Sequence, residues 1–236
     1  MKTQTLEYKH DGVTCRGLLA TPDGSGKRPG VLVFHEAPGL DEHAKKRVGM
    51  LAELGYVALG VDMYGDGKVT MGPEALELMN AVKNDRPKFL GRLRAGYEAL
   101  VAQSNVEKRQ LAAIGYCFGG YCVLELARSG VDLAAAVTFH GLLETQNPAA
   151  AGKVKPKILV CTGAEDPLVP AAQVLEFEDE MTKAGVDWQV ITYSGAKHAF
   201  TNTGADQIPF PGFGYHPLAD RRSWAAMRGL FSEVFA

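Results

Sequence analysis

The sequence predicts an α/β fold, with a doubly wound, mostly parallel sheet flanked by helices. Short apolar runs typical of buried strands alternate with segments of helical spacing along the whole chain. Polar residues follow several of these runs, at the edge where sheets of this class bind ligands. The 236 residues suit one domain of ordinary size, and no repeat or linker divides them. We therefore expect residues 1–236 to form a single domain.

The first part of the chain predicts an edge hairpin and two central strands. Residues 6–20 alternate weakly around a turn, as in an antiparallel hairpin. Residues 30–34 and 56–61 are continuous apolar runs, which is typical of buried parallel strands. Between them, residues 42–54 have helical spacing and are followed by Gly55, a common helix stop.

The rest of the chain continues the alternation of strands and helices. Further helices are predicted over 73–82, 86–102, 117–128, 171–184 and 218–234, and further strands over 110–114, 133–139, 157–161 and 188–192. A loop rich in proline, glycine and aromatic residues covers 200–217. Such alternation favours parallel pairing, because a helix returns the chain to the side on which the next strand begins.

Composition and charge narrow the class of function. Hydrophobic residues make up 46% of the chain and charged residues 22%, which are globular values. A net charge of −2 gives no electrostatic footprint for nucleic acid, and no basic run indicates a membrane surface. Residues 1–12 lack the apolar core of a signal peptide, so we expect a cytoplasmic location. The sequence makes no prediction of the oligomeric state.

The cysteines indicate chemistry and not cross-linking. The chain has four cysteines, Cys15, Cys117, Cys122 and Cys161. No two of them have the C-x-x-C spacing of a redox or zinc motif. We expect all four to be reduced thiols, with at least one of them catalytic.

The turn between the predicted strand 110–114 and the helix that follows carries a candidate nucleophile. It reads Gly115-Tyr-Cys-Phe-Gly-Gly120, which resembles the nucleophile elbow of α/β-hydrolases with Cys117 in place of serine. Glycines permit such a sharp turn, since larger side chains would collide with the neighbouring strand and helix. The turn would lift the sulfur to the top of the sheet, near the positive end of a helix. The alternative is an ordinary strand–helix turn that holds a buried cysteine.

Three residues in order along the chain predict a catalytic triad. Cys117, Asp166 and His198 each follow a predicted strand, in the order found in α/β-hydrolases. A thiol becomes a strong nucleophile once a base takes its proton, and histidine exchanges protons near neutral pH. A carboxylate on the second ring nitrogen fixes the tautomer and stabilises the imidazolium. Taken singly, Asp166 could be a turn residue before Pro167, and His198 a surface histidine.

Glu36 is open to several interpretations. His35-Glu36 begins like a zincin motif, but Gly39 stands where the second histidine is needed, so we expect no metal site. A carboxylate near a thiol opposes formation of the thiolate and can accept the thiol proton. The structural alternative is an ion pair with a base such as Arg47.

These motifs together resemble the dienelactone hydrolase (carboxymethylenebutenolidase) family of α/β-hydrolases. The matching stretches run from about residue 30 to the C-terminus: His35-Glu-Ala-Pro-Gly39, Gly115-Tyr-Cys-Phe-Gly-Gly120, Gly163-Ala-Glu-Asp-Pro167, Gly195-Ala-Lys-His-Ala-Phe200 and residues 215–224. The resemblance implies an α/β-hydrolase fold and hydrolysis of a small ester or lactone through an acyl-enzyme, without a cofactor. It also implies that Glu36 takes the thiol proton when substrate displaces it. Backbone N–H groups of Ala37 and Phe118 would form the oxyanion hole.

The expected substrate site differs from that of the well-known members of this family. Those members hold a substrate carboxylate with arginines, one of them shortly after the catalytic histidine, whereas residues 198–203 and 62–68 contain none. We expect Tyr64, Phe200 and Phe213 to contact the substrate, since stiff aromatic side chains often wall such pockets. The alternative for the aromatic rings of the 200–217 loop is that they only hold the last helix in place. The sequence therefore predicts a less anionic small-molecule substrate.

Two other functions would use the same residues. Thioester hydrolysis or acyl transfer to an acceptor other than water needs the same triad. A non-catalytic redox or binding module could use Cys117 alone.

Overall fold

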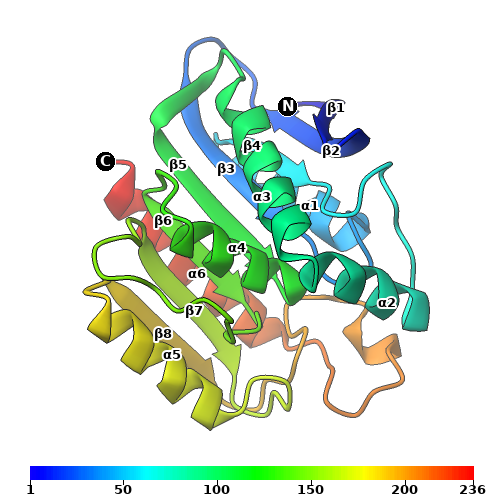
Figure 1. The fold of residues 1–236 in the computed structure, drawn as a ribbon, viewed down its shortest axis with the longest axis vertical. Coiled ribbons are helices and arrows are strands. Elements are labelled where there is room, and N and C mark those ends of the chain that lie inside the picture. The colour runs from blue at the N-terminus through cyan, green and yellow to red at the C-terminus, as the bar shows by residue number, and fades with distance from the viewer. The chain divides into compact units, whose positions relative to one another are not determined.

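The computed structural model describes residues 1–236 and has the predicted α/β fold (Figure 1). Its eight strands form one mostly parallel sheet in the order β1-β2-β4-β3-β5-β6-β7-β8. The chain divides into two compact units, an N-terminal unit (Met1–Ala113) and a C-terminal unit (Ile114–Ala236), and strand β5 (Val106–Tyr116) runs from the first into the second.

The elements follow one another as the apolar runs and helical segments predict. The N-terminal unit contains β1 (Lys2–His10), β2 (Val13–Thr21), β3 (Arg28–Phe34), α1 (Glu42–Glu53), β4 (Val57–Val61), α2 (Gly72–Lys83) and α3 (Arg86–Val101). The C-terminal unit contains α4 (Phe118–Arg128), β6 (Ala135–Phe139), β7 (Lys157–Gly163), α5 (Ala171–Lys183), β8 (Trp188–Tyr193), the short 3-10 helix η1 (Ala205–Gln207) and α6 (Pro217–Val234). None of the helices is long and apolar enough to cross a membrane.

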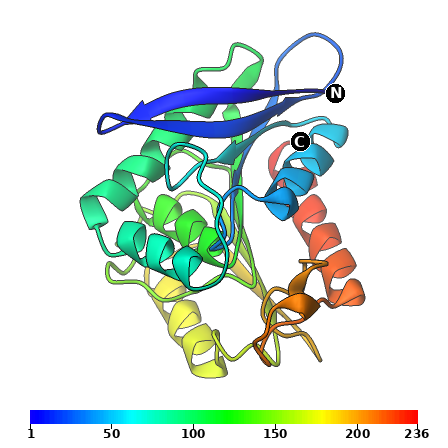
Figure 2. The ribbon, with the colours of Figure 1, turned by 90° about the vertical axis from the view of Figure 1, so that its right-hand side faces the viewer.

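The predicted edge hairpin is present in the N-terminal unit. β1 and β2 pair antiparallel over their whole length and form the long twisted ribbon of Figure 2. Asp11 and Gly12 connect them with positive φ angles of 50° and 74°, the backbone that a two-residue hairpin turn of this hand requires. β2 also pairs antiparallel with β4, and β4 pairs parallel with β3.

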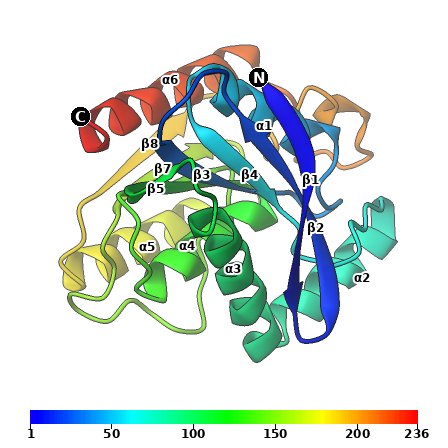
Figure 3. The ribbon, with the colours of Figure 1, turned by 90° about the horizontal axis from the view of Figure 1, so that it is seen from above.

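Helices cover both faces of the sheet in each unit, as in a doubly wound fold. In the N-terminal unit α1 and α3 lie on opposite sides of the strands, and in the C-terminal unit α4 and α5 lie opposite α6 (Figure 3). Helix α1 begins where the Asp41 carboxylate accepts the N–H of Ala44 at 3.0 Å, and it ends before Gly55, whose φ is +95°. In the C-terminal unit β6, β7 and β8 pair in parallel, so their carboxyl ends reach one edge.

Two differences from the sequence-based expectation have a simple cause. Strand β5 begins at Val106, whereas the sequence predicted a start at Gln110. The first residues of the strand are partly exposed and include charged side chains, which hide the apolar pattern of a strand. Within the 200–217 loop, η1 was not predicted, since a three-residue helix is too short to leave a periodic signal.

Candidate active site

The elbow forms at the start of the C-terminal unit. Cys117 lies between β5 and α4 with a φ of 52° and a ψ of −116°, a strained backbone for a residue with a side chain. A Cβ on Gly115 would collide with the backbone of Gly119, which explains the glycine at that position. The Cys117 N–H donates to the carbonyl of Phe139 at 3.2 Å, which ties the elbow to the end of β6. Cys117 is partly exposed, whereas the other three free cysteines are buried.

Asp166 and His198 meet in the same unit. Asp166 follows β7, His198 follows β8, and Nδ1 of the imidazole lies 2.8 Å from Oδ2 of the carboxylate, with both side chains fully buried. Since the carboxylate can only accept, Nδ1 carries the proton. The second carboxylate oxygen of Asp166 accepts the N–H of Leu168 at 2.9 Å, which orients the carboxylate. The other ring nitrogen, Nε2, is left for proton exchange.

The electrostatics of His198 involve Cys117 directly. Burial is the largest influence and lowers the pKa of His198, but the charge of Cys117 and the hydrogen bond to Asp166 outweigh it and raise the pKa to about 10. A weaker interaction of hydrogen-bond type with Cys117 adds to the effect of its charge on the pKa of His198, although Nε2 and the sulfur do not form a hydrogen bond of ordinary geometry. A negative charge on Cys117 therefore favours the protonated form of His198.

The loop after His198 holds the imidazole between aromatic rings. Its backbone N–H donates to the carbonyl of Gly212 at 2.9 Å, and the N–H of Gly214 donates to the carbonyl of His198 at 3.1 Å. These bonds bring the ring of Phe213 to 4.8 Å from the imidazole, at 64° between the ring planes. Phe200 is fully buried beside His140 and Tyr193, so its ring supports this loop from within.

Two loops of the N-terminal unit carry the other predicted site residues. Glu36 and Ala37 follow β3, Tyr64 follows β4, and the Tyr64 hydroxyl donates to the carbonyl of Ala37 at 2.7 Å. His35 joins the same loops: its Nε2 accepts the N–H of Met63 at 3.3 Å, so Nδ1 carries the proton and donates to the carbonyl of Glu36 at 2.6 Å. Burial lowers the pKa of His35, which keeps the ring neutral in this role.

Asp62 organises the loop after β4, a role that the sequence did not reveal. Its buried carboxylate accepts four backbone N–H groups at 2.8–3.0 Å, from Arg16, Tyr64, Gly65 and Gly67. An aspartate followed by closely spaced glycines is typical of a side chain that caps its own turn, and this was the available signal.

Arg92 follows the loop after β4 in the sequence, but its side chain is engaged in the protein interior. Arg92 is only 2% exposed, and its Nη1 lies 2.6 Å from the sulfur of Cys15, also fully buried. Its guanidinium is therefore part of the interior of the N-terminal unit. No group of three or more histidine, cysteine, aspartate or glutamate side chains is arranged to hold a metal ion.

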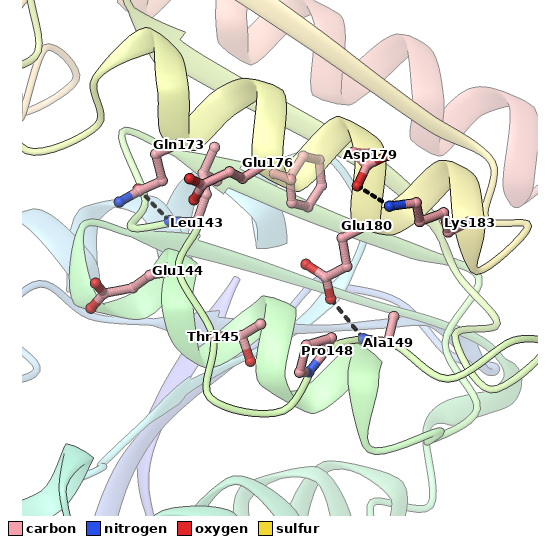
Figure 4. Close-up of a pocket in the computed structure, with 11 residues that line it drawn as sticks. Leu143, Glu144, Thr145, Pro148, Ala149, Gln173, Glu176, Asp179, Glu180 and Lys183 are labelled. Carbon is pink, nitrogen blue, oxygen red and sulfur yellow. Dashed lines mark hydrogen bonds and ion pairs between the residues drawn. The ribbon is translucent and has the colours of Figure 1, made fainter.

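A separate cavity of about 380 Å³ lies between α5 and the segment after β6 (Figure 4). Two backbone N–H groups of that segment donate to α5 side chains, Leu143 to Gln173 at 3.0 Å and Ala149 to Glu180 at 2.7 Å. None of the predicted site residues lines this cavity. It is thus distinct from the Asp166–His198 pair.

A doubly wound sheet with a sharp, strained turn between strand and helix, followed by an aspartate and a histidine after later strands, is the architecture of an α/β-hydrolase. The chain belongs to the dienelactone hydrolase family, whose model matches residues 15–235. It is therefore an enzyme of the class that hydrolyses esters and lactones.

The chain is also similar to several known proteins. "Protein usf" of Aquifex pyrophilus is 30% identical over 236 residues, which cover 98% of each chain. The solved structure called m3DLH is 43% identical, with a TM-score of 0.95 and coverage of 100% of this chain and 99% of that one. A dienelactone hydrolase-like promiscuous phosphotriesterase, P91 from metagenomic libraries, is 41% identical with a TM-score of 0.95, and the match covers 99% of this chain and 98% of that one.

Proposed function

We propose that the protein is a cysteine-dependent hydrolase of small esters or lactones that works through a Cys117–His198–Asp166 triad. The observation that carries this proposal is the buried 2.8 Å pair of His198 and Asp166 in the unit that also contains the elbow. The raised pKa of His198, to which the charge of Cys117 contributes, supports the coupling of base and nucleophile.

Each step follows from the chemistry of these groups. The thiol proton passes to Glu36, and the Cys117 thiolate attacks the carbonyl carbon while His198 is in its imidazolium form. The π electrons of the carbonyl move onto its oxygen, which becomes an oxyanion. When the tetrahedral intermediate collapses, the alkoxide leaves with a proton from His198, and a thioester to Cys117 remains. His198 then takes a proton from water, which attacks the thioester carbon and releases the acid and the thiolate. Backbone N–H groups of Ala37 and Phe118 are the proposed donors to the oxyanion.

The decisive experiment compares Cys117→Ala with Cys161→Ala in the hydrolysis of p-nitrophenyl acetate. Cys161 is fully buried in β7, where burial raises the pKa of its thiol to about 12, so it cannot serve as the nucleophile. We expect Cys117→Ala to lower kcat by several orders of magnitude and Cys161→Ala to keep most of it. Retained kcat in Cys117→Ala would overturn the proposal. A wild-type protein without any turnover would favour a redox or binding module.

Glu36 is proposed as the group that receives the thiol proton. In this role Glu36→Gln changes the rate at which iodoacetamide alkylates free Cys117 and the dependence of that rate on pH. Glu42→Gln is the matched control, because the Glu42 side chain is 91% exposed on α1. Identical alkylation profiles of wild type and Glu36→Gln would leave Glu36 with a structural role only.

The relative P91 favours a second substrate class, phosphotriesters, for the same nucleophile. The phosphorus of a triester would take the place of the carbonyl carbon, and sulfur would attack it. Release of p-nitrophenol from a neutral p-nitrophenyl phosphotriester by wild type, and its loss in Cys117→Ala, would establish this activity. Absence of release at high enzyme concentration would exclude it.

A further inference from the structure

The imidazole of His198 lies between two tilted rings from different parts of the C-terminal unit. One is the ring of Phe213, whose centroid lies 4.8 Å from that of His198. The other is the ring of His140, whose centroid lies 5.3 Å from that of His198, with the two planes at 68°. Neither the triad nor the oxyanion hole assigns any role to His140. Its ring nevertheless contacts His198, and the residue before it, Phe139, is hydrogen-bonded to the backbone of Cys117.

His140 is the residue at which β6 ends, and its backbone is fixed on both sides. Its N–H donates to the carbonyl of Cys161 at 2.8 Å, and the preceding residue, Phe139, accepts the N–H of Cys117. Its φ of 42° is unusual for a residue with a side chain, and such conformations often mark functional positions. The ring is completely buried, and Nε2 forms a 2.8 Å hydrogen bond with Oγ1 of Thr201.

Thr201 belongs to the loop that begins with the catalytic histidine. It lies three residues after His198 and is itself buried, with 1% exposed. The hydrogen bond between Thr201 and His140 therefore connects the end of β6 to this loop, 61 residues further along the chain. A fixed distance between these two segments sets the distance between the rings of His140 and His198.

We propose that His140, oriented by Thr201, is a positioning residue for His198 that also favours its imidazolium form. This inference rests on the proposed function, because it assumes that His198 is the catalytic base. Edge-to-face packing restricts the tilt of the imidazole, and a displacement of about 1 Å at a reacting centre can reduce a rate by about a hundredfold. A neighbouring π system also attracts a cation, so His140 stabilises the proton that His198 holds before the leaving group takes it.

The pH dependence of the reaction separates this role from simple packing. Three groups that can carry charge face His198: Asp166 from the loop after β7, Cys117 from the elbow, and His140 from the end of β6, while Phe213 is uncharged. Loss of the His140 ring removes one stabilising influence from the imidazolium. His198 then loses its proton at a lower pH, so the alkaline limb of kcat/KM moves to lower pH.

The experiment uses His140→Asn, Thr201→Val and Thr201→Ser in the full chain. Asparagine tolerates a positive φ, so His140→Asn tests the ring without straining the backbone. Thr162→Val is the matched control for Thr201→Val, because Thr162 is equally buried and its hydroxyl has no hydrogen-bond partner. We measure kcat and KM with p-nitrophenyl acetate from pH 5 to 10, together with thermal unfolding.

We expect His140→Asn and Thr201→Val to lower kcat by roughly ten- to a hundredfold, with KM changed little and the alkaline limb displaced to lower pH. Thr201→Ser keeps the hydroxyl, so its kcat and the pH of its alkaline limb should equal those of wild type. Thr162→Val should also resemble wild type in both. The double variant His140→Asn/Thr201→Val loses less than the product of the single losses, since the two residues act as one unit.

Two results would overturn the inference. In the first, His140→Asn and Thr201→Val keep the kcat and the pH profile of wild type, while His198→Ala is inactive. This result would reject the role of His140 and leave the proposed function intact. The other is a loss of kcat that follows the melting temperature alone, equal in Thr162→Val, with no movement of the pH limb. Turnover retained in His198→Ala would instead reject the proposed function itself.

Discussion

At the scale of single residues, the proposed chemistry depends on which nitrogen of His198 carries the proton. The Asp166 carboxylate accepts from Nδ1, which leaves Nε2 for proton exchange. The other oxygen of Asp166 accepts the N–H of Leu168, so the carboxylate is held from two directions. Glu165, its neighbour in sequence, is exposed and takes no part in this arrangement.

The first prediction is that Asp166→Asn lowers kcat by roughly 10³- to 10⁴-fold. The amide keeps an oxygen for Leu168, but it can present an N–H to His198 and so favour the wrong imidazole tautomer. Steady-state kinetics check the rate, and a circular dichroism spectrum like that of wild type checks the fold. Glu165→Gln is the control and keeps kcat. An Asp166→Asn enzyme with normal kcat would mean that another carboxylate orients His198.

At the scale of elements, the contact between β5 and α4 requires glycine. A side chain on Gly115 would meet the carbonyl of Gly119 on the next helix, which is backbone and cannot move aside without reshaping the turn. Gly120 is equally constrained, since a Cβ there would press on Gly141. The second prediction is therefore that Gly115→Ala destabilises the protein by about 3 kcal/mol.

Gly229→Ala provides the control for this change. Gly229 lies in α6, where a Cβ would meet nothing within 4 Å, so alanine stabilises the helix by up to about 1 kcal/mol. Urea unfolding of both variants gives the two free energies. Equal midpoints for wild type and Gly115→Ala would contradict the close approach of strand and helix.

A buried ion-pair network joins α4 and α5. Arg128 donates to Glu125 at 3.0 Å on its own helix and to Glu180 of α5 at 2.7 Å, and the Arg128 and Glu125 side chains are 3% and 0% exposed. Thr145, in the segment after β6, donates to the same oxygen of Glu125 at 2.6 Å. The network thus fixes two helices and the segment that lines the 380 Å³ cavity.

The third prediction is that Arg128→Met destabilises the protein by about 3–5 kcal/mol. Removing the guanidinium leaves two carboxylates close together and one of them fully buried, which is the costly way to break such a pair. Lys183→Met is the control, because Lys183 pairs with Asp179 in an exposed ion pair that contributes at most about 1 kcal/mol. Denaturant unfolding at constant pH measures both. Similar losses in the two variants would show that burial of this network is unimportant.

At the scale of the whole molecule, the distribution of arginines bears on substrate choice. The chain has a net charge of −2, and residues 199–203, which follow His198, contain no arginine. Arg92 is buried against Cys15. A carboxylate entering a dry site without a cationic partner costs several kcal/mol.

The fourth prediction is that neutral esters and lactones give a higher kcat/KM than partners that differ only by a carboxylate. Matched pairs of substrates at one ionic strength provide the comparison. A preference for the carboxylate member would indicate a cation from another position, with Lys68, Arg86 and Lys197 as candidates. Substitution of each by methionine would then identify it, since only the true partner would abolish the preference.

The fold class, the order of strands and helices and the candidate triad could all be predicted from the amino-acid sequence. These features are local: an apolar run, a helix stop such as Gly55 and a glycine-rich turn around Cys117 are each specified by neighbouring residues. Parallel strands bring their carboxyl ends to one edge, so Asp166 and His198 could be expected near each other without coordinates.

The contacts between side chains could not be predicted and are seen first in the folded molecule. The tertiary structure paired His198 with Asp166, buried Arg92 against Cys15 and gave Asp62 four N–H donors. It also placed His140 beside His198 and joined it to Thr201. Most of these contacts link residues that are far apart in the chain. Packing and burial select them, and neither leaves a periodic signal in the sequence.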